Sequence, residues 1–216
     1  MNKNLSNRIF TSIILLMIVI LCLFFHKYSW LFLLIISSVI CFFEFNKLLN
    51  KIWKKKNLNN NLIKLFCFLY LLLFIYSSYE LYNIGLDLTL FVLLICIFSD
   101  IGGYVVGKIV GGKKLTKISP NKTISGSIGS FVFSIIPIFL YNFYNENEYQ
   151  LQLSLVFFSL QVSLVCQLGD LLISYFKRNA KVKDTGSILP GHGGLLDRID
   201  GIVFGLPFGL LLLLIL

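Results

Sequence analysis

The chain has 216 residues, of which 57% are hydrophobic and only 13% are charged. Soluble domains carry about 25% charged residues, so this composition excludes a soluble globular protein and indicates an integral membrane protein. The formal net charge of +9 is typical of basic loops beside anionic lipid headgroups, and because no nucleic-acid-binding motif accompanies it, we expect no nucleic acid partner.

Seven apolar segments follow one another along the chain, and each approaches the roughly 20 residues that cross a bilayer core. Strands are disfavoured because the segments lack period-two alternation and because an open sheet edge is unstable in lipid. The sequence therefore predicts an all-α, polytopic transmembrane helical bundle. The expected segments are residues 9–25, 29–43, 62–78, 82–99, 124–141, 151–176 and 202–216.

Lysine and arginine are concentrated in alternate connections between these segments. If the segments alternate in direction, 17 of the 19 basic residues fall on one side of the membrane. Because basic loops stay cytoplasmic, we expect a cytoplasmic N-terminus, polar loops on the cytoplasmic side and a multi-pass protein of the cell inner membrane. The basic stretches are the N-terminal tail and residues 44–61, 100–123 and 177–200.

A first polar stretch, residues 99–126, follows the fourth apolar segment. It contains Asp100 at a segment end and the sequence SPNKT at 119–123. One interpretation is an ordinary loop with small-residue helix packing, which explains its glycines. The other gives Ser119 and Lys122 a role in phosphate or nucleotide binding, with Asp100 as a further acid. Spacing alone leaves both interpretations open.

Polar side chains interrupt the sixth apolar segment at intervals of four and three residues, which places them on one stripe of a helix. Asp170 would lie about 9 Å below the cytoplasmic end of that helix, at 1.5 Å per residue. An intramembrane carboxylate usually faces a cavity, a partner or an ion, so Asp170 either pairs with a basic side chain or binds a divalent metal. The stripe consists of Ser163, Gln167, Asp170, Ser174 and Lys177.

The most polar part of the chain is residues 174–200, which include the turn PGHGG at 190–194. Glycines let backbone amides approach an anion, and a following helix N-terminus adds a favourable dipole. The spacing of Asp197 and Asp200 would put both acids on one helix face, where they could join Asp170 at a metal. A plain re-entrant turn is the alternative, but four neighbouring cations favour phosphate binding: Lys177, Arg178, Lys183 and Arg198.

Residues 99–204 resemble the phosphatidate cytidylyltransferase (CDP-diacylglycerol synthase) family. The family signature of Ser-x-x-Lys-Arg, Lys-Asp, Pro-Gly-His-Gly-Gly and Asp-Arg-x-Asp occurs without a gap from Ser174 to Asp200. The sequences GDL at 169–171 and SPNKT at 119–123 are also similar to the family. The chain departs from the pattern at three positions, with Gly103 in place of the usual Ala and with Ser125 and Ile173 where an acid is common.

The resemblance implies an enzyme of phospholipid biosynthesis that transfers a cytidylyl group from CTP to phosphatidate, giving CDP-diacylglycerol and pyrophosphate. It also implies Mg²⁺ as the cofactor, with or without a second cation. The implied catalytic residues are Asp170, Asp197, Asp200, Lys177, Arg178 and Arg198, and the implied metal ligands are the same three acids with Asp100. The implied substrate-binding residues are Ser119, Lys122, Ser174, Lys183, Asp184, Gly191, His192, Gly193 and Gly194.

We expect residues 1–98 to form N-terminal membrane-spanning helices and residues 99–216 to form the catalytic region. His192 either contacts substrate or only forms a hydrogen bond in the turn. The glycines and short spans are compatible with a homodimer. Two alternative functions stay open. One is other CTP chemistry, in a polyprenol or dolichol kinase or in an enzyme acting on archaeal-type lipid phosphates, and the other is a transporter or channel that works without nucleotide.

Overall fold

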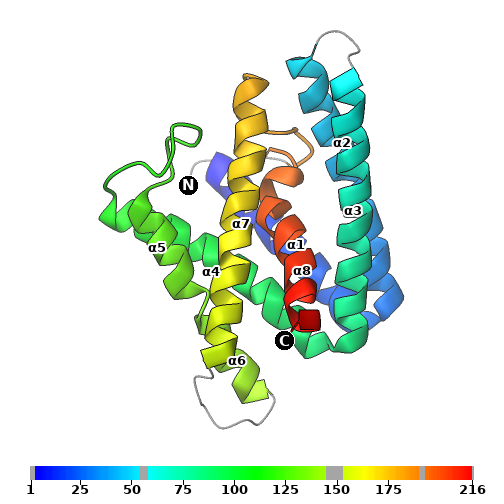
Figure 1. Cartoon of the computed structure of the whole chain (residues 1–216), viewed down its shortest axis with the longest axis vertical. Helices are drawn as coiled ribbons and strands as arrows, with labels where there is room; N and C mark the ends of the chain where they lie inside the picture. The colour runs from blue at the N-terminus through cyan, green and yellow to red at the C-terminus, as the bar shows by residue number, and fades with distance from the viewer. Residues whose placement is uncertain (1–2, 54–57, 145–152, 190–192, 216) are drawn as a thin grey trace. The chain divides into compact units, whose positions relative to one another are not determined.

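The computed structural model describes residues 3–53, 58–144, 153–189 and 193–215. These residues form eight α-helices and no strand, which confirms the predicted all-α fold (Figure 1). The helices are α1 (Lys3–Phe25), α2 (Lys27–Ile52), α3 (Leu58–Ile84), α4 (Leu86–Val110), α5 (Ile124–Phe133), α6 (Ile136–Tyr144), α7 (Leu153–Asn179) and α8 (Leu196–Ile215).

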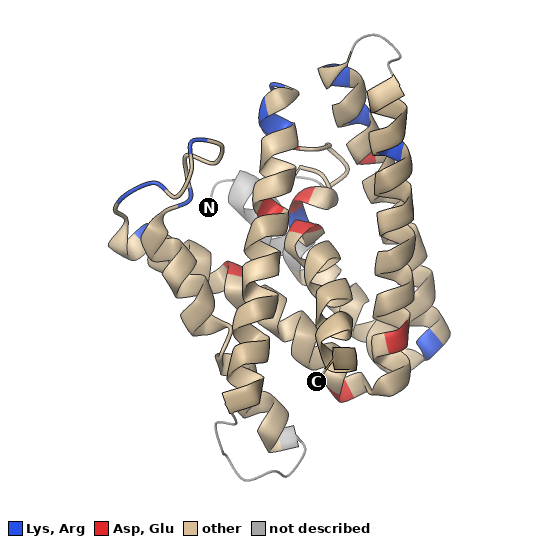
Figure 2. Cartoon of the chain, in the orientation of Figure 1, with Lys and Arg blue, Asp and Glu red and all other residues tan. Residues whose placement is uncertain are grey.

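Six stretches of the described chain are long and apolar enough to cross a membrane, namely α2, α3, α4, α7, α8 and the joined stretch Ile124–Phe143 of α5 and α6. The first expected segment, residues 9–25, corresponds to α1, whose apolar part Ile13–Phe25 is shorter. Figure 2 shows long helical stretches without charge and basic residues gathered in the loop between α4 and α5. The chain is therefore a multi-pass membrane protein, and the side on which each end lies stays a prediction.

Several helices extend beyond the predicted apolar segments, among them α2, α4 and α7. α2 continues to Ile52 and α4 to Val110, so residues 44–52 and 100–110 are helical although the sequence places them in loops. α7 includes Lys177 and Arg178 in its last turn. Hydropathy marks where a helix becomes polar, and this point differs from the residue at which backbone hydrogen bonding ends. Basic side chains are favourable in a last turn because they interact with the helix dipole.

The chain forms two compact units. Unit 1 consists of residues 1–79 and 176–199, and unit 2 consists of residues 80–175 and 200–216. The helices α7 and α8 contribute to both units. The expected division into residues 1–98 and 99–216 concerned function, and it stays a prediction.

In unit 1, α2 and α3 pack side by side and run antiparallel (Figure 1). The Trp30 indole Nε1 donates to the Ser78 carbonyl at 3.3 Å, which joins the start of α2 to the end of α3. The Lys64 ammonium donates to the Asn50 side-chain oxygen at 2.8 Å, which joins the opposite ends. This pairing fixes the rotation of α2 and determines which of its side chains are buried.

In unit 2, α4 and α5 approach closely through glycines. A Cβ on Gly126 would lie 2.7 Å from the Gly103 carbonyl oxygen, and a Cβ on Gly102 would overlap the Gly129 carbonyl oxygen. The interpretation of these glycines as small-residue helix packing is therefore confirmed. Because the two backbones are so close, the loop between them is held beside both helices.

Small residues also join α4 to α7 and α8. The Ser99 and Ser163 hydroxyl oxygens are 2.8 Å apart, and the Cys96 and Cys166 sulfurs are 3.1 Å apart. A Cβ on Gly205 of α8 would lie 2.6 Å from the Cys166 sulfur. Through these contacts, the polar stripe of α7 faces α4.

Candidate active site

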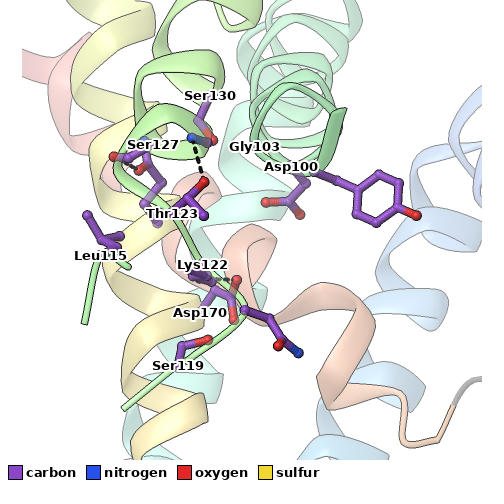
Figure 3. Close-up of a pocket in the computed structure, with 13 residues that line it drawn as sticks. Asp100, Gly103, Leu115, Ser119, Lys122, Thr123, Ser127, Ser130 and Asp170 are labelled. Atoms are coloured by element: carbon purple, nitrogen blue, oxygen red, sulfur yellow. Dashed lines mark hydrogen bonds and ion pairs between the residues drawn. The ribbon is translucent and has the colours of Figure 1, made fainter. Parts of the chain in front are cut away.

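A cavity of about 300 Å³ lies in unit 2 between α4, the loop 111–123, α5 and α7 (Figure 3). Its size is at the lower end of the range for small-molecule sites. We call it the cavity. The predicted site residues that line it are Asp100, Ser119, Lys122 and Asp170.

The loop before α5 places Lys122 at the cavity through a turn and a helix cap. The Lys122 amide donates to the Ser119 carbonyl at 3.1 Å, with Pro120 at the second turn position, where its fixed φ is favourable. The next residue, Thr123, accepts the Gly126 amide at 3.0 Å and caps the N-terminus of α5. Lys122 is therefore held on both sides by residues with defined backbone geometry.

Two acids from different helices line the cavity. Asp100 comes from α4, and Asp170 comes from α7, where it forms an ion pair with Lys122 (Figure 3). The Asp170 and Lys122 side chains are 27% and 26% exposed. The Ser174 hydroxyl donates to Asp170 Oδ1 at 3.4 Å. The structure thus shows the basic partner that the sequence left open for Asp170, and metal binding stays a prediction.

Other cavity residues were not among the predicted site residues. Gln167 belongs to the polar stripe of α7, and its Oε1 accepts the Ser127 hydroxyl of α5 at 2.5 Å. The four- and three-residue spacing already marks Gln167 in the sequence. Tyr104 and Ser127 carry no comparable signal, because their place in the site depends on how α4 and α5 pack.

In unit 1, the described loop residues 180–189 and 193–195, here called the signature loop, are organised around Asp197. The Lys177 ammonium donates to Asp197 Oδ1 at 2.7 Å, and the two side chains are only 13% and 6% exposed. Asp197 Oδ2 accepts the Thr185 amide at 2.7 Å, the Thr185 hydroxyl at 2.9 Å and the Gly194 amide at 3.2 Å. Both carboxylate oxygens of Asp197 are therefore engaged by the protein.

Glu44 of α2 is a second acid at this loop, and it is not among the predicted site residues. Its side chain is almost fully buried, with the residue 1% exposed. Glu44 Oε1 accepts the Leu195 amide at 3.0 Å, and Oε2 accepts the Leu196 amide and the Thr185 hydroxyl, each at 2.9 Å. An isolated acid inside the apolar sequence CFFEF is a signal that could have identified it.

Glycines let these acids approach the backbone of the loop. A Cβ on Gly186 would lie 2.6 Å from Glu44 Oε1, and a Cβ on Gly194 would lie 2.5 Å from Glu44 Oε2. Gly193 has a φ of 90°, which side-chain-bearing residues rarely adopt. The carboxylates that these glycines admit in the structure belong to the protein itself, and phosphate binding by Gly193 and Gly194 stays a prediction.

The remaining predicted residues are spread over both units. Asp200 is buried in α8, and its Oδ1 accepts the Gly201 amide at 2.9 Å. Gly191 and His192 lie outside the described residues. Asp170 and Asp197 belong to different units, so their convergence stays a prediction. The exposed predicted residues of unit 1 are Arg178, Lys183, Asp184 and Arg198.

The acids of the cavity fit a magnesium ion better than Asp197 does. In the described part of the chain, no three side chains of His, Cys, Asp or Glu gather into a metal cluster. Magnesium is usually held by one or two carboxylates together with substrate phosphates, so a pair of acids is sufficient. Asp100 and Asp170 line one cavity, whereas the Asp197 carboxylate already accepts hydrogen bonds from Lys177 and two backbone amides and shares the Thr185 hydroxyl with Glu44.

Comparison with known proteins gives one family over most of the chain. Residues 52–216 match the model of the cytidylyltransferase family. A phosphatidate cytidylyltransferase of Staphylococcus saprophyticus is 42% identical over 130 residues, which cover 60% of this chain and 50% of the relative. Enzymes of the same name from Staphylococcus haemolyticus and Staphylococcus aureus are 46% identical over 125 residues and 47% over 133, covering 57% and 60% of this chain and 47% and 50% of those relatives. The chain spans about half the length of these relatives.

Proposed function

The chain belongs to the cytidylyltransferase family, and on this basis we propose that it transfers a cytidylyl group from CTP to phosphatidate within the membrane. The names of its staphylococcal relatives support this choice of lipid substrate. The structural observation that carries the proposal is the cavity in which Asp100, Asp170 and Lys122 meet.

The reaction joins two anions, so the site must first offset their repulsion. A phosphate oxygen of phosphatidate attacks the α-phosphorus of CTP. A new P–O bond forms, the bond to the oxygen that bridges to the β-phosphate breaks, and pyrophosphate leaves with its electron pair. Lys122 would exchange its contact with Asp170 for a substrate phosphate, where its charge stabilises the transition state more than the separated reactants.

Asp100 and Asp170 are the residues that would hold Mg²⁺ in the cavity. When bound, the ion supplies positive charge to phosphate oxygens and to the leaving pyrophosphate. Asp170 has a second task in this scheme, since it orients Lys122 before substrate binds. Asp197 and Asp200 as further ligands, and a second cation, stay predictions.

The exposed cations of unit 1 are proposed to attract phosphate groups. Arg178, Lys183 and Arg198 are exposed residues within or beside the signature loop. CTP would reach them from the cytosol if the basic loops face the cytoplasm of an inner membrane, as the charge distribution predicts. The homodimer and the absence of a nucleic acid partner stay predictions.

The proposed function can be tested with purified protein, CTP labelled in its cytidine, a phosphatidate and Mg²⁺. We expect label in the lipid phase and an equal amount of released pyrophosphate. A kinase would instead release CDP and leave the lipid without cytidine. Absence of labelled lipid, with solute flux through liposomes in the absence of CTP, would replace the proposal with a transporter.

A further inference from the structure

We propose that Glu44 is a positioning residue that holds the signature loop in the geometry in which Lys177 and Asp197 are presented. The part of the proposal that concerns activity rests on the proposed function. Glu44 lies in α2, before residues 52–216 that match the family model. The match itself therefore assigns it no role.

Among the described residues, the hydrogen bonds that Glu44 accepts come from the signature loop and the start of α8. Its two oxygens accept the Leu195 amide, the Leu196 amide and the Thr185 hydroxyl at distances of 2.9 to 3.0 Å. The residue is 1% exposed. A buried carboxylate is stable only where donors satisfy it, so the loop has to keep these donors in place.

Thr185 connects Glu44 to Asp197. Its hydroxyl oxygen lies 2.9 Å from Glu44 Oε2 and 2.9 Å from Asp197 Oδ2, and its single hydrogen is donated to one of them at a time. Its backbone amide donates to Asp197 Oδ2 at 2.7 Å. A displacement of Glu44 therefore reaches Asp197 through one residue, and reaches Lys177 through its ion pair with Asp197.

Glu44 also determines where α8 begins. The first amides of a helix have no acceptor within the helix, and a carboxylate at this end is favoured by the helix dipole. Glu44 supplies that acceptor for Leu195 and Leu196, which directly precede Asp197. The direction of the Asp197 side chain thus depends on an acid from α2.

At two positions of the loop there is no room for a side chain beside Glu44. The ideal Cβ positions of Gly186 and Gly194 would lie 2.6 Å and 2.5 Å from its two oxygens. The close approach of Glu44 to these two glycines is a steric observation, separate from its hydrogen bonds. Both observations show a loop whose backbone is shaped around this carboxylate.

The first experiment measures amide hydrogen exchange of the purified protein in Glu44→Ala and in a matched control. Ser38→Ala is the control, because Ser38 is a buried residue of the same helix whose hydroxyl has no hydrogen-bond partner among the described residues. We expect faster exchange in residues 185–189 and 193–197 of Glu44→Ala, with α3 unchanged. Ser38→Ala should exchange like the wild type throughout.

The second experiment separates turnover from binding. We expect kcat of Glu44→Ala to fall about 10- to 100-fold, as for residues that orient groups in direct contact with substrate or metal, with little change in KM for CTP. Glu44→Gln should recover part of the activity because its amide oxygen still accepts one of the two backbone amides. Thr185→Val should lower kcat less when it is made in the Glu44→Ala variant than when it is made in the wild type. The reason is that the two residues act in series.

Three outcomes would overturn the proposal: unchanged exchange in residues 185–189 and 193–197, a uniform rise across α2 and α3, or a wild-type kcat in Glu44→Ala. If Glu44→Ala fails to insert, Glu44→Gln and Thr185→Val decide by the same readouts. An inactive wild type would refute the proposed function separately, since hydrogen exchange tests the anchoring of the loop without substrate.

Discussion

The acidic side chains at the cavity in unit 2 are partly exposed to solvent. Two acidic side chains at the signature loop in unit 1, those of Glu44 and Asp197, are almost fully surrounded by protein. The Asp170 side chain is 27% exposed and pairs with one lysine at the cavity. The Asp197 side chain is 6% exposed and accepts hydrogen bonds from a lysine, a hydroxyl and two backbone amides. An acid in the first setting can exchange its partner for a ligand, whereas an acid in the second setting is fixed in one orientation by the groups that surround it.

The glycines of the two regions also differ in what they allow to approach them. Gly103 and Gly126 let α4 and α5 approach each other, and both glycines line the cavity. Gly186 and Gly194 let a carboxylate of the protein enter the signature loop. A glycine-rich motif near phosphate-binding residues therefore does not by itself locate the phosphate. The comparison predicts separate effects on stability and on turnover when each region is changed.

The largest expected effect is on stability, from Asp197→Asn. The substitution leaves the buried Lys177 ammonium without its counterion, and breaking a buried pair in this way destabilises by about 3 kcal/mol or more. The apparent unfolding temperature in a fixed detergent measures it. Asp184→Asn in the same loop is the exposed control and should have little effect. Equal unfolding temperatures for the two variants would contradict the enclosed role of Asp197.

Asp170→Asn should have a large effect on turnover and a small effect on stability. We expect turnover to fall about 100- to 1,000-fold, as when a group that stabilises developing charge is removed, because Lys122 and Mg²⁺ lose their anionic partner. Stability should change by less than about 1 kcal/mol, because pairs this exposed are screened by solvent. Labelled lipid formed per minute and the unfolding temperature are measured on the same preparation. Near-normal turnover would remove Asp170 from the site.

The sequence predicts the helices well because bilayer length and hydropathy fix them locally. It also predicts the stripe of α7, since a spacing of four and three residues defines a face whatever the partner is. Asp170 is recognised in this way as an acid that needs a partner, and Lys122 supplies it in the structure.

Glu44 could not be predicted in the same way, because its partners lie 141 to 152 residues away in the sequence. Its helix continues past the end of the apolar run, so the sequence assigns Glu44 to a polar loop. Ser127 and Tyr104 depend equally on the packing of α4 against α5. An isolated acid in an apolar sequence can mark Glu44 as a residue that needs donors, but no local pattern indicates which distant residues supply them.

Gly126→Ala tests whether helix packing forms the cavity, with an expected effect of about 1 to 2 kcal/mol on stability. The new Cβ would lie 2.7 Å from the Gly103 carbonyl, so α5 has to move, and overpacking of this kind destabilises although alanine favours helix. KM for CTP should rise as well, since Gly126 lines the cavity. Gly201→Ala is the matched control, because its Cβ would meet Cys166 at an ordinary 3.4 Å.

The smallest effect is expected for Lys122→Met, which keeps the length of the side chain and removes its charge. Lys122 and Asp170 are each about one quarter exposed, so loss of their pair should change stability by less than about 1 kcal/mol. Loss of one charged contact to a phosphate should raise KM for CTP about tenfold, which corresponds to about 1.4 kcal/mol.

Lys177→Met is the control that separates the two regions most clearly. It removes the same charge from a buried pair, so Asp197 keeps its backbone donors but loses its only cation among the described residues. We expect the unfolding temperature to fall in Lys177→Met and KM for CTP to rise in Lys122→Met. If both variants changed the same quantity by the same amount, the open and enclosed acids would not have the different roles that their exposure and hydrogen bonding indicate.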